Sequence, residues 1–134
     1  MRKRAVMYAM CAVLSMAIAG AASADNHAIK LSNKDGVGKF LTDAKGMTLY
    51  IFKKDSPGKS ACTGPCVVKW PLYSREKVSV PEGVTAGDFG TITREDGKTQ
   101  TTYKGMPLYY FEGDKKSGDV AGQGFGNVWF VANP

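Results

Sequence analysis

The sequence contains an internal repeat at a fixed offset of 59 residues. Seven identities fall in this one register without a gap: Gly46 and Gly105, Met47 and Met106, Leu49 and Leu108, Tyr50 and Tyr109, Phe52 and Phe111, Asp55 and Asp114, Trp70 and Trp129. Such a repeat predicts two copies of one small unit that bury their apolar faces against each other. We therefore expect a single domain in which neither copy folds alone.

The N-terminus has the pattern of a Sec-type export signal. A basic start precedes an apolar run over residues 5–19, and small residues at 22–24 form a peptidase site. The run has about 15 residues, whereas a membrane-spanning helix needs roughly 20. Cys11 has no small residue before it, which disfavours lipid attachment. We expect a signal peptide over residues 1–24, cleavage after Ala24 and no transmembrane segment in the mature chain.

The charge of the mature chain is mild. The signal peptide carries three of the 18 basic residues and none of the 12 acidic ones, which leaves 15 basic residues against 12 acidic. These charges are dispersed along the chain, and this argues against nucleic acid as a partner. Export implies a periplasmic or secreted location, where disulfides form.

Strand patterns dominate the mature chain, whereas 16 glycines interrupt any helical pattern. Asp96-Gly97 is a strong signal for a tight hairpin, because this pair tolerates the backbone conformation that such turns need. The apolar patterns predict two hairpins and two further strands, over residues 39–42 with 47–52, 90–93 with 98–103, 106–112 and 127–132.

These elements predict an all-β domain, either a compact sandwich or a barrel-like arrangement with glycine-rich loops. We expect the domain to span residues 37–134, with repeats at about 37–73 and 88–132. Residues 25–36 are expected to form a flexible segment ahead of it. Both faces of the repeated strands are apolar, so both strands should be covered on two sides. Pro107 donates no backbone hydrogen bond, which predicts a sheet edge or a bulge there.

The repeated aromatic and acidic residues are a candidate for either core or site. They could line a ligand pocket where the copies meet, or they could pack in the core, where tyrosine hydroxyls would need partners such as the aspartates. The aspartates are expected to accept backbone hydrogen bonds in turns, with a ligand or cation as the alternative. The set comprises Tyr50, Phe52, Asp55, Trp70, Tyr109, Phe111, Asp114 and Trp129.

Two cysteines remain after export, Cys62 and Cys66, and a turn-forming Thr63-Gly64-Pro65 separates them. An oxidising compartment favours a disulfide between them. The alternative is a copper or thiol-redox site, since two thiolates can hold a soft ion. His27 is the only histidine and lies near the mature N-terminus, which argues against histidine-dependent catalysis.

Two segments share the motif Y-x-[FWY]-x-x-D, from Tyr50 to Asp55 and from Tyr109 to Asp114. A C-x-G-x-C segment at Cys62, followed by Trp70-Pro71, adds a third motif. Together they resemble the bacterial "secreted repeat of unknown function" family of predicted exported proteins and lipoproteins. The resemblance covers residues 37–132 and implies an extracytoplasmic protein of two units. It carries no catalytic residue, cofactor or activity.

We therefore expect an exported periplasmic protein that is not an enzyme, either a binding module or a structural component of the envelope. Its partner would be a small molecule or an envelope protein, and it would need no cofactor. The alternatives are copper or thiol-redox chemistry at Cys62 and Cys66, and hydrolysis by a carboxylate pair such as Asp55 with Asp114.

Overall fold

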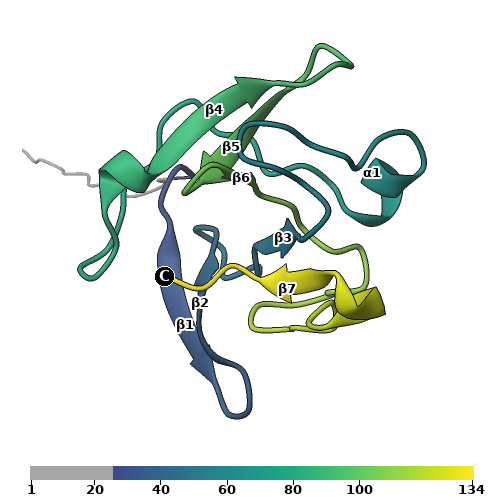
Figure 1. Ribbon diagram of the computed structural model, residues 1–134. Coiled ribbons are helices and arrows are strands. Elements are labelled where there is room, and N and C mark those ends of the chain that lie inside the picture. The colour runs from purple at the N-terminus through teal and green to yellow at the C-terminus, as the bar shows by residue number, and fades with distance from the viewer. Residues whose placement is uncertain (1–25) are drawn as a thin grey trace, which may run out of the picture.

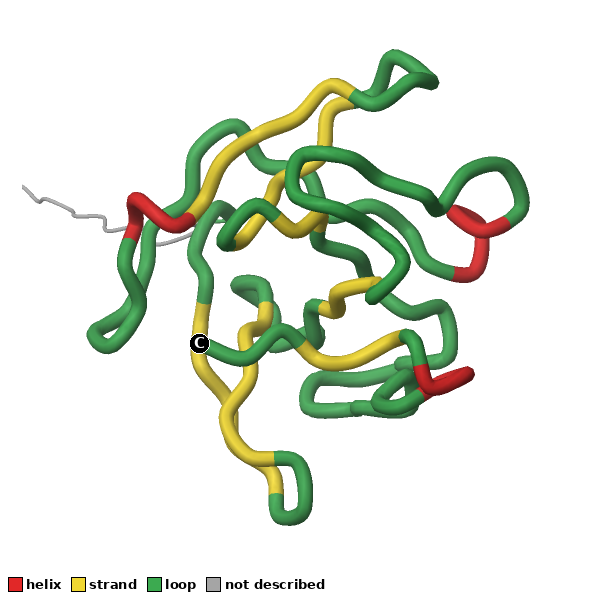
Figure 2. Tube along the Cα trace, in the orientation of Figure 1, coloured by secondary structure: helices red, strands yellow, loops and turns green. Residues whose placement is uncertain are grey.

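The computed structural model describes residues 26–134, so the predicted signal peptide and its cleavage site lie outside the described residues. Short strands joined by long loops make up this part of the chain (Figures 1 and 2). In chain order the elements are β1 (Lys30–Lys34), β2 (Gly38–Thr42), β3 (Tyr50–Phe52), α1 (Cys66–Lys69), η1 (Ala86–Asp88), β4 (Phe89–Thr93), β5 (Thr99–Tyr103), β6 (Met106–Pro107), η2 (Phe125–Asn127) and β7 (Trp129–Val131).

The strands form three small antiparallel sheets, in the orders β1-β2, β3-β7 and β4-β5-β6. The expected all-β single domain is confirmed. Among the described residues the sheets do not close into a barrel (Figure 1). Pro107 lies in β6, an edge strand of its sheet, as its missing backbone donor predicts. No helix in the described part of the chain is both long enough and apolar enough to span a bilayer.

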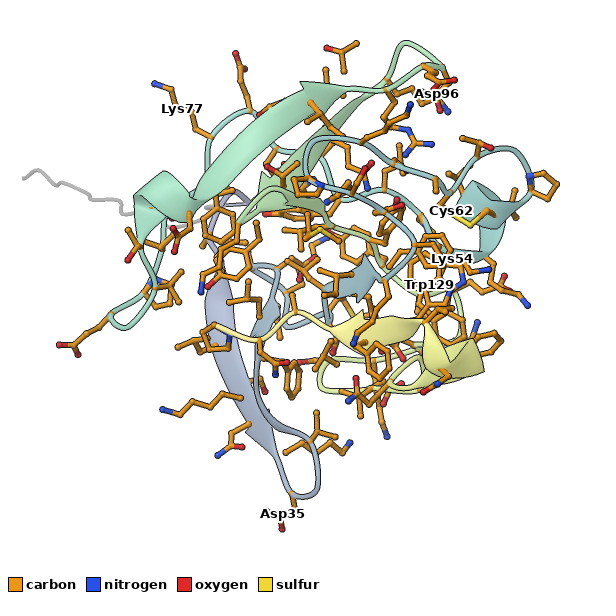
Figure 3. The ribbon with its side chains drawn as sticks, in the orientation of Figure 1. Asp35, Lys54, Cys62, Lys77, Asp96 and Trp129 are labelled. Carbon is orange, nitrogen blue, oxygen red and sulfur yellow. A yellow bond between two sulfur atoms is a disulfide. The ribbon has the colours of Figure 1, made fainter. Side chains whose placement is uncertain are left out.

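The β1-β2 and β4-β5 hairpins are counterparts in the two copies. Each has a three-residue turn, closed by Val37 N–H to Lys34 O at 2.9 Å and by Gly97 N–H to Arg94 O at 2.9 Å. Figure 3 shows the two turns, marked by Asp35 and Asp96, at the outer ends of their hairpins. The β4-β5 hairpin confirms the hairpin that the sequence predicts over residues 90–93 and 98–103.

The expectation of a flexible segment over residues 25–36 is wrong, because Lys30–Lys34 within it forms β1. This strand pairs along its whole length with β2, from Lys30 opposite Thr42 to Lys34 opposite Gly38. Ile29, just before it, is buried in the core. The first structural repeat therefore begins near residue 30 rather than 37.

The two copies exchange their returning segments. In one sheet region, the Leu49 N–H donates to Leu41 O at 3.0 Å, both from the first copy. Ala132, from the end of the second copy, donates its N–H to Leu49 O at 2.9 Å and accepts from the Leu41 N–H at 2.8 Å.

The same three bonds recur with the copies interchanged. The Leu108 N–H donates to Thr101 O at 3.0 Å, both from the second copy. Tyr73, which follows Trp70-Pro71 in the first copy, donates to Leu108 O at 3.1 Å and accepts from the Thr101 N–H at 2.9 Å. Each copy therefore completes its backbone hydrogen bonds with a segment of the other, so that neither is a closed unit by itself.

The core consists of two clusters of buried side chains. One gathers Ile29, Leu41, Leu49, Tyr73, Tyr103, Leu108 and Ala132. The other gathers Phe40, Tyr50, Cys62, Trp70, Tyr109, Trp129 and Val131. Because Leu49 and Tyr50 alternate along the chain, the two faces of the repeated segment enter different clusters. Leu49, Tyr50, Leu108 and Tyr109 are all fully buried, which confirms the prediction of cover on both sides.

The predicted strands over 47–52, 106–112 and 127–132 exist only in part. β3, β6 and β7 are shorter, and isolated bridges pair Tyr109 with Tyr50 and with Leu72. A bridge between Thr42 and Thr48 is the part of the predicted hairpin over 39–42 and 47–52 that forms. The one-turn helix α1 had no signal in the apolar pattern. It follows Pro65, and its last turn closes with the Trp70 N–H on Cys66 O at 2.9 Å.

Candidate functional site

The two repeated tyrosines meet at the centre of the molecule. The Tyr50 N–H donates to Tyr109 O at 2.8 Å, and the Tyr109 N–H donates to Tyr50 O at 3.0 Å. This reciprocal pair relates identical positions of the two copies, as a local twofold axis requires. The repeated motif therefore lies at the junction between the copies.

Each tyrosine hydroxyl binds the aspartate of the opposite copy. Tyr50 Oη donates to Asp114 Oδ2 at 2.7 Å, and Tyr109 Oη donates to Asp55 Oδ2 at 2.7 Å. The other carboxylate oxygens accept the Ala121 N–H at 2.8 Å and the Ala61 N–H at 2.6 Å. The expectations that the aspartates accept backbone hydrogen bonds and provide partners for tyrosine are both confirmed. The exchange between copies was not foreseen.

Electrostatics keeps these hydroxyls as donors. Burial, assisted by the bond to a carboxylate, raises the pKa of Tyr50 and of Tyr109 well above the usual tyrosine value. Burial also raises the pKa of Asp55 and Asp114, although the hydrogen bonds that they accept oppose this effect. All four side chains are at most 8% exposed.

The aromatic members of the motif form a stack of four rings. Trp70 and Trp129 lie face to face, with centroids 3.7 Å apart and planes within 2°. Phe52 stacks on Trp129 at 4.1 Å, and Phe111 stacks on Trp70 at 4.3 Å, so each phenylalanine again pairs with the other copy. The structure thus brings all eight repeated site candidates together around one centre.

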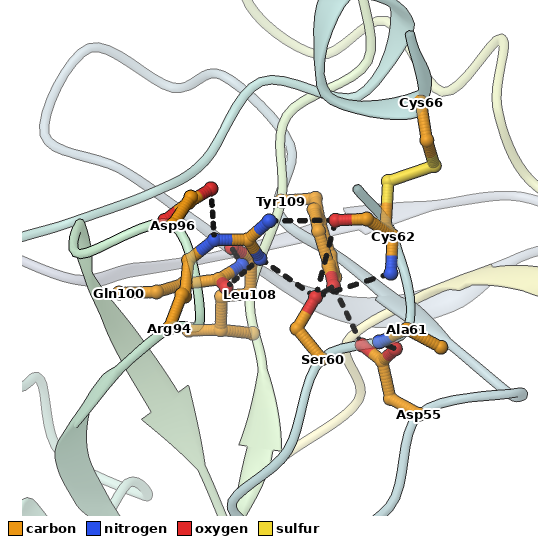
Figure 4. The surroundings of a disulfide bond; sticks show 10 residues. All are labelled: Asp55, Ser60, Ala61, Cys62, Cys66, Arg94, Asp96, Gln100, Leu108 and Tyr109. Atoms are coloured by element: carbon orange, nitrogen blue, oxygen red, sulfur yellow. Dashed lines mark hydrogen bonds and ion pairs between the residues drawn. A yellow bond between two sulfur atoms is a disulfide. The ribbon is translucent and has the colours of Figure 1, made fainter. Parts of the chain in front are cut away.

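Arg94, which the sequence did not single out, anchors a polar network beside this centre (Figure 4). Its guanidinium is almost fully buried and donates to Ser60 Oγ at 2.6 Å, Gln100 Oε1 at 2.8 Å and Cys62 O at 2.6 Å. Its Nε forms an ion pair with Asp96 at 3.1 Å. Buried arginine needs such a full set of partners.

Ser60 joins this network to the repeated motif. Its hydroxyl lies 2.6 Å from Tyr109 Oη, and because Tyr109 donates to Asp55, the serine is the donor in this contact. The network therefore runs from Arg94 through Ser60 and Tyr109 to Asp55. The sequence signal that could have suggested it is weak: Arg94 directly precedes the turn residues of a hairpin.

The predicted Cys62–Cys66 disulfide is present, with Cα atoms 5.3 Å apart. Cys62 is fully buried, and Arg94 holds its carbonyl against the β4-β5 hairpin. We call residues 54–66, the segment that ends in this bond, the disulfide loop. No group of three or more histidine, cysteine, aspartate or glutamate side chains in residues 26–134 is arranged to hold a metal ion.

An open cleft lies between the disulfide loop and the β4-β5 hairpin. Two adjoining hollows of about 280 and 490 Å³ share Lys59, Ser60, Thr63 and Glu95. Arg94 lines the smaller hollow, and Lys54 and Ser56 line the larger one. Two lysines, an arginine and four hydroxyls against one lining carboxylate give this cleft a positive, hydrogen-bonding surface.

Comparison with known proteins separates what is recognisable in this chain from what is not. No curated protein and no solved structure matches the sequence. A family model described as a secreted repeat of unknown function matches residues 32–73 and 90–133. The two matched segments cover more than half of the chain, and they correspond to the two copies that exchange strands and tyrosine–aspartate bonds at the junction. The chain belongs to the family of secreted repeats of unknown function.

Proposed function

We propose that the exported protein is a non-enzymatic binding module of the cell envelope, and that the cleft between the disulfide loop and the β4-β5 hairpin is its ligand site. The observation that carries this proposal is the grouping of Lys54, Lys59 and Arg94 around two adjoining hollows beside a buried polar network. The proposal includes no cofactor and no catalytic step.

The repeated aromatic and acidic motif acts in this proposal as a structural clasp. Its tyrosine hydroxyls and aspartate oxygens bind one another across the junction, and Tyr50 and Tyr109 are fully buried. A ligand at these groups would have to replace bonds between a hydroxyl and a carboxylate, which are among the stronger hydrogen bonds in proteins. A ligand in the cleft would not have to replace these bonds.

The chemistry of the cleft favours a small anion that carries a phosphate or carboxylate group. The exposed ammonium groups of Lys54 and Lys59 supply charge, and the hydroxyls of Ser56 and Thr63 supply hydrogen bonds. Arg94 adds positive charge where it lines the smaller hollow, and its hydrogen bonds to Ser60 and Cys62 hold the disulfide loop against the β4-β5 hairpin. A positive cleft also raises the local concentration of anions at its mouth.

The test is calorimetric titration of the mature protein with inorganic phosphate and with succinate, at low ionic strength. We expect one of the two anions to bind, and Lys59→Gln to weaken that binding by roughly tenfold, as the loss of a charged hydrogen bond predicts. Lys39→Gln is the matched control, because Lys39 is also exposed but lies on β2. Equal losses in both variants, or binding of neither anion, would overturn the assignment of the cleft.

A further inference from the structure

The central contact of the four-ring stack at the junction is closer and more parallel than is usual for aromatic side chains. Aromatic rings in proteins usually meet edge to face or with an offset, at centroid distances of roughly 4.5–7 Å. Trp70 and Trp129 instead overlap at 3.7 Å and 2°. Two indoles in such contact share the positive charge that remains when one electron is removed, and this makes the pair easier to oxidise than a single indole.

A tyrosine lies edge-on to each tryptophan of the pair. The ring centroids of Tyr50 and Trp70 are 5.4 Å apart, and those of Tyr109 and Trp129 are 5.0 Å apart. Each tyrosine hydroxyl already donates to a buried carboxylate at 2.7 Å. Oxidation of tyrosine at neutral pH requires release of the phenolic proton, and a carboxylate within hydrogen-bond reach can accept it directly.

From this arrangement we infer that the junction is a one-electron relay, in which the Trp70–Trp129 pair is oxidised first and Tyr50 then becomes the tyrosyl radical as its proton passes to Asp114. The oxidant is a peroxyl radical or another strong one-electron oxidant in the envelope. This activity is independent of the anion cleft.

The two tyrosines are not equivalent, and the difference selects Tyr50. Tyr109 Oη contacts Ser60, which in turn binds the positively charged guanidinium of Arg94. A nearby positive charge opposes removal of an electron. Tyr50 Oη accepts only a neutral donor, the Gly122 N–H at 3.1 Å, in addition to its bond to Asp114.

The step balances in electrons and protons. Tyr50 loses one electron through Trp70 and transfers its phenolic proton to the Asp114 carboxylate, which leaves a neutral tyrosyl radical beside a neutral carboxylic acid. A peroxyl radical gains that electron and one proton from the solvent and becomes a hydroperoxide. A one-electron reductant such as a thiol restores Tyr50, and Asp114 returns its proton to the phenolic oxygen.

Phe125 provides one route by which an oxidant in solvent can reach the relay. This side chain is 42% exposed, and its ring lies 5.7 Å from Trp70 and 5.6 Å from Phe111. An oxidant in contact with Phe125 is thus separated from the tryptophan pair by one ring. The tyrosine–aspartate bonds themselves remain buried, so that the radical is shielded from solvent.

The test oxidises the mature protein with photogenerated tris(bipyridine)ruthenium(III), and follows radicals by transient absorption and by freeze-quench electron paramagnetic resonance. We expect a tryptophan radical that decays into a tyrosyl radical in the wild-type protein. Tyr50→Phe should abolish the tyrosyl signal and prolong the tryptophan one, whereas Tyr109→Phe should retain both steps. Asp114→Asn should also lose the tyrosyl signal, because the proton has no acceptor.

Tyr110→Phe is the matched control. Tyr110 Oη donates to Asp43 Oδ2 at 2.7 Å, so it has the same kind of bond, but it packs on Tyr73 rather than on a tryptophan. An unchanged tyrosyl yield in Tyr50→Phe, or an equal loss in Tyr110→Phe, would overturn the relay. If Tyr50→Phe does not fold, the rate of tyrosyl formation in wild-type protein is compared in light and heavy water, and the absence of an isotope effect would refute proton transfer.

Discussion

Replacing Tyr50 and Tyr109 by phenylalanine tests whether the repeated motif holds the two copies together. Each of the two substitutions removes one buried hydroxyl and very little volume, so the ring contacts with Trp70 and Trp129 persist. Each hydroxyl lost is the donor in a 2.7 Å bond to a carboxylate of the opposite copy. The carboxylate oxygen that remains is buried and has lost a donor.

A hydrogen bond to a charged group contributes about 1.5–3 kcal/mol, and a buried acceptor left without its donor brings the cost toward the upper end. We therefore expect each single variant to lose about 2 kcal/mol of unfolding free energy. The two hydroxyls bind different carboxylates, so their effects should be nearly additive and the double variant should lose about 4 kcal/mol. For a small domain, whose total stability is roughly 5–15 kcal/mol, that is a large fraction.

The measurement is urea unfolding followed by tryptophan fluorescence, because Trp70 and Trp129 lie in the junction itself. Ser74→Ala is the control: it removes an exposed hydroxyl bonded to Thr99 at 2.9 Å, and should change stability by less than about 0.5 kcal/mol. If the tyrosine variants have the same free energy of unfolding as the Ser74→Ala control, the bonds between copies do not stabilise the fold. If they keep their stability but lose anion binding, the motif is a ligand site and the clasp assignment fails.

Four further predictions follow from the same contacts. Residues 25–80 and 81–134, expressed separately, should show no cooperative unfolding, since each copy lacks its exchanged segment; a cooperative transition in either half would contradict this. Thiol titration of the denatured, unreduced mature protein should find no free thiol, whereas two thiols would contradict the disulfide. Gly122→Ala should destabilise the protein by roughly 1–3 kcal/mol, because its Cβ would lie 2.8 Å from the Trp70 ring, whereas the control Gly87→Ala meets no atom within 4 Å and has no positive φ. Finally, burial raises the pKa of Asp114, so protonation of this side chain stabilises the folded state at acid pH, and that contribution is lost as pH rises through the folded pKa. The free energy of unfolding of the wild type relative to Asp114→Asn, measured in urea, should therefore fall from mildly acid to neutral pH. A difference that stays constant with pH would refute the assignment.

Local sequence patterns were sufficient where a contact depends on neighbours in the chain. The β4-β5 turn carries Asp96-Gly97, and Cys62 and Cys66 are brought together by the turn between them, so both features could be predicted. The β1-β2 turn also carries an Asp-Gly pair, Asp35-Gly36, but this pair lies 61 residues before Asp96-Gly97 rather than 59. The turn after β2 has one more residue than the turn after β5, so the register of 59 does not extend to the β1-β2 hairpin, which was not predicted from the sequence.

Contacts between the copies could not be predicted in the same way. An internal repeat predicts that Tyr50 and Tyr109 have equivalent surroundings, but a bond to the aspartate of the same copy would satisfy the sequence equally well. The choice of the opposite copy depends on the path of the whole chain. Arg94 was missed for a related reason: an arginine beside a turn is normally solvated, and its burial here results from the disulfide loop that covers it.

The symmetry of the fold indicates where the two copies differ in structure. Lys34 and Arg94 occupy equivalent positions, each at the start of a hairpin turn. Lys34 is exposed and reaches Gly118 O at 3.3 Å, whereas Arg94 is buried in a network that includes Ser60. Ala61 and Ala121 donate equivalent bonds to the two repeated aspartates, so Ser60 corresponds to Val120, which has no hydroxyl. Because the junction uses residues that the copies share, a change there disturbs both copies, whereas a change at Arg94 or Ser60 alters one side only. The proposed ligand cleft beside Arg94 is thus free to vary in sequence while the shared junction preserves the fold.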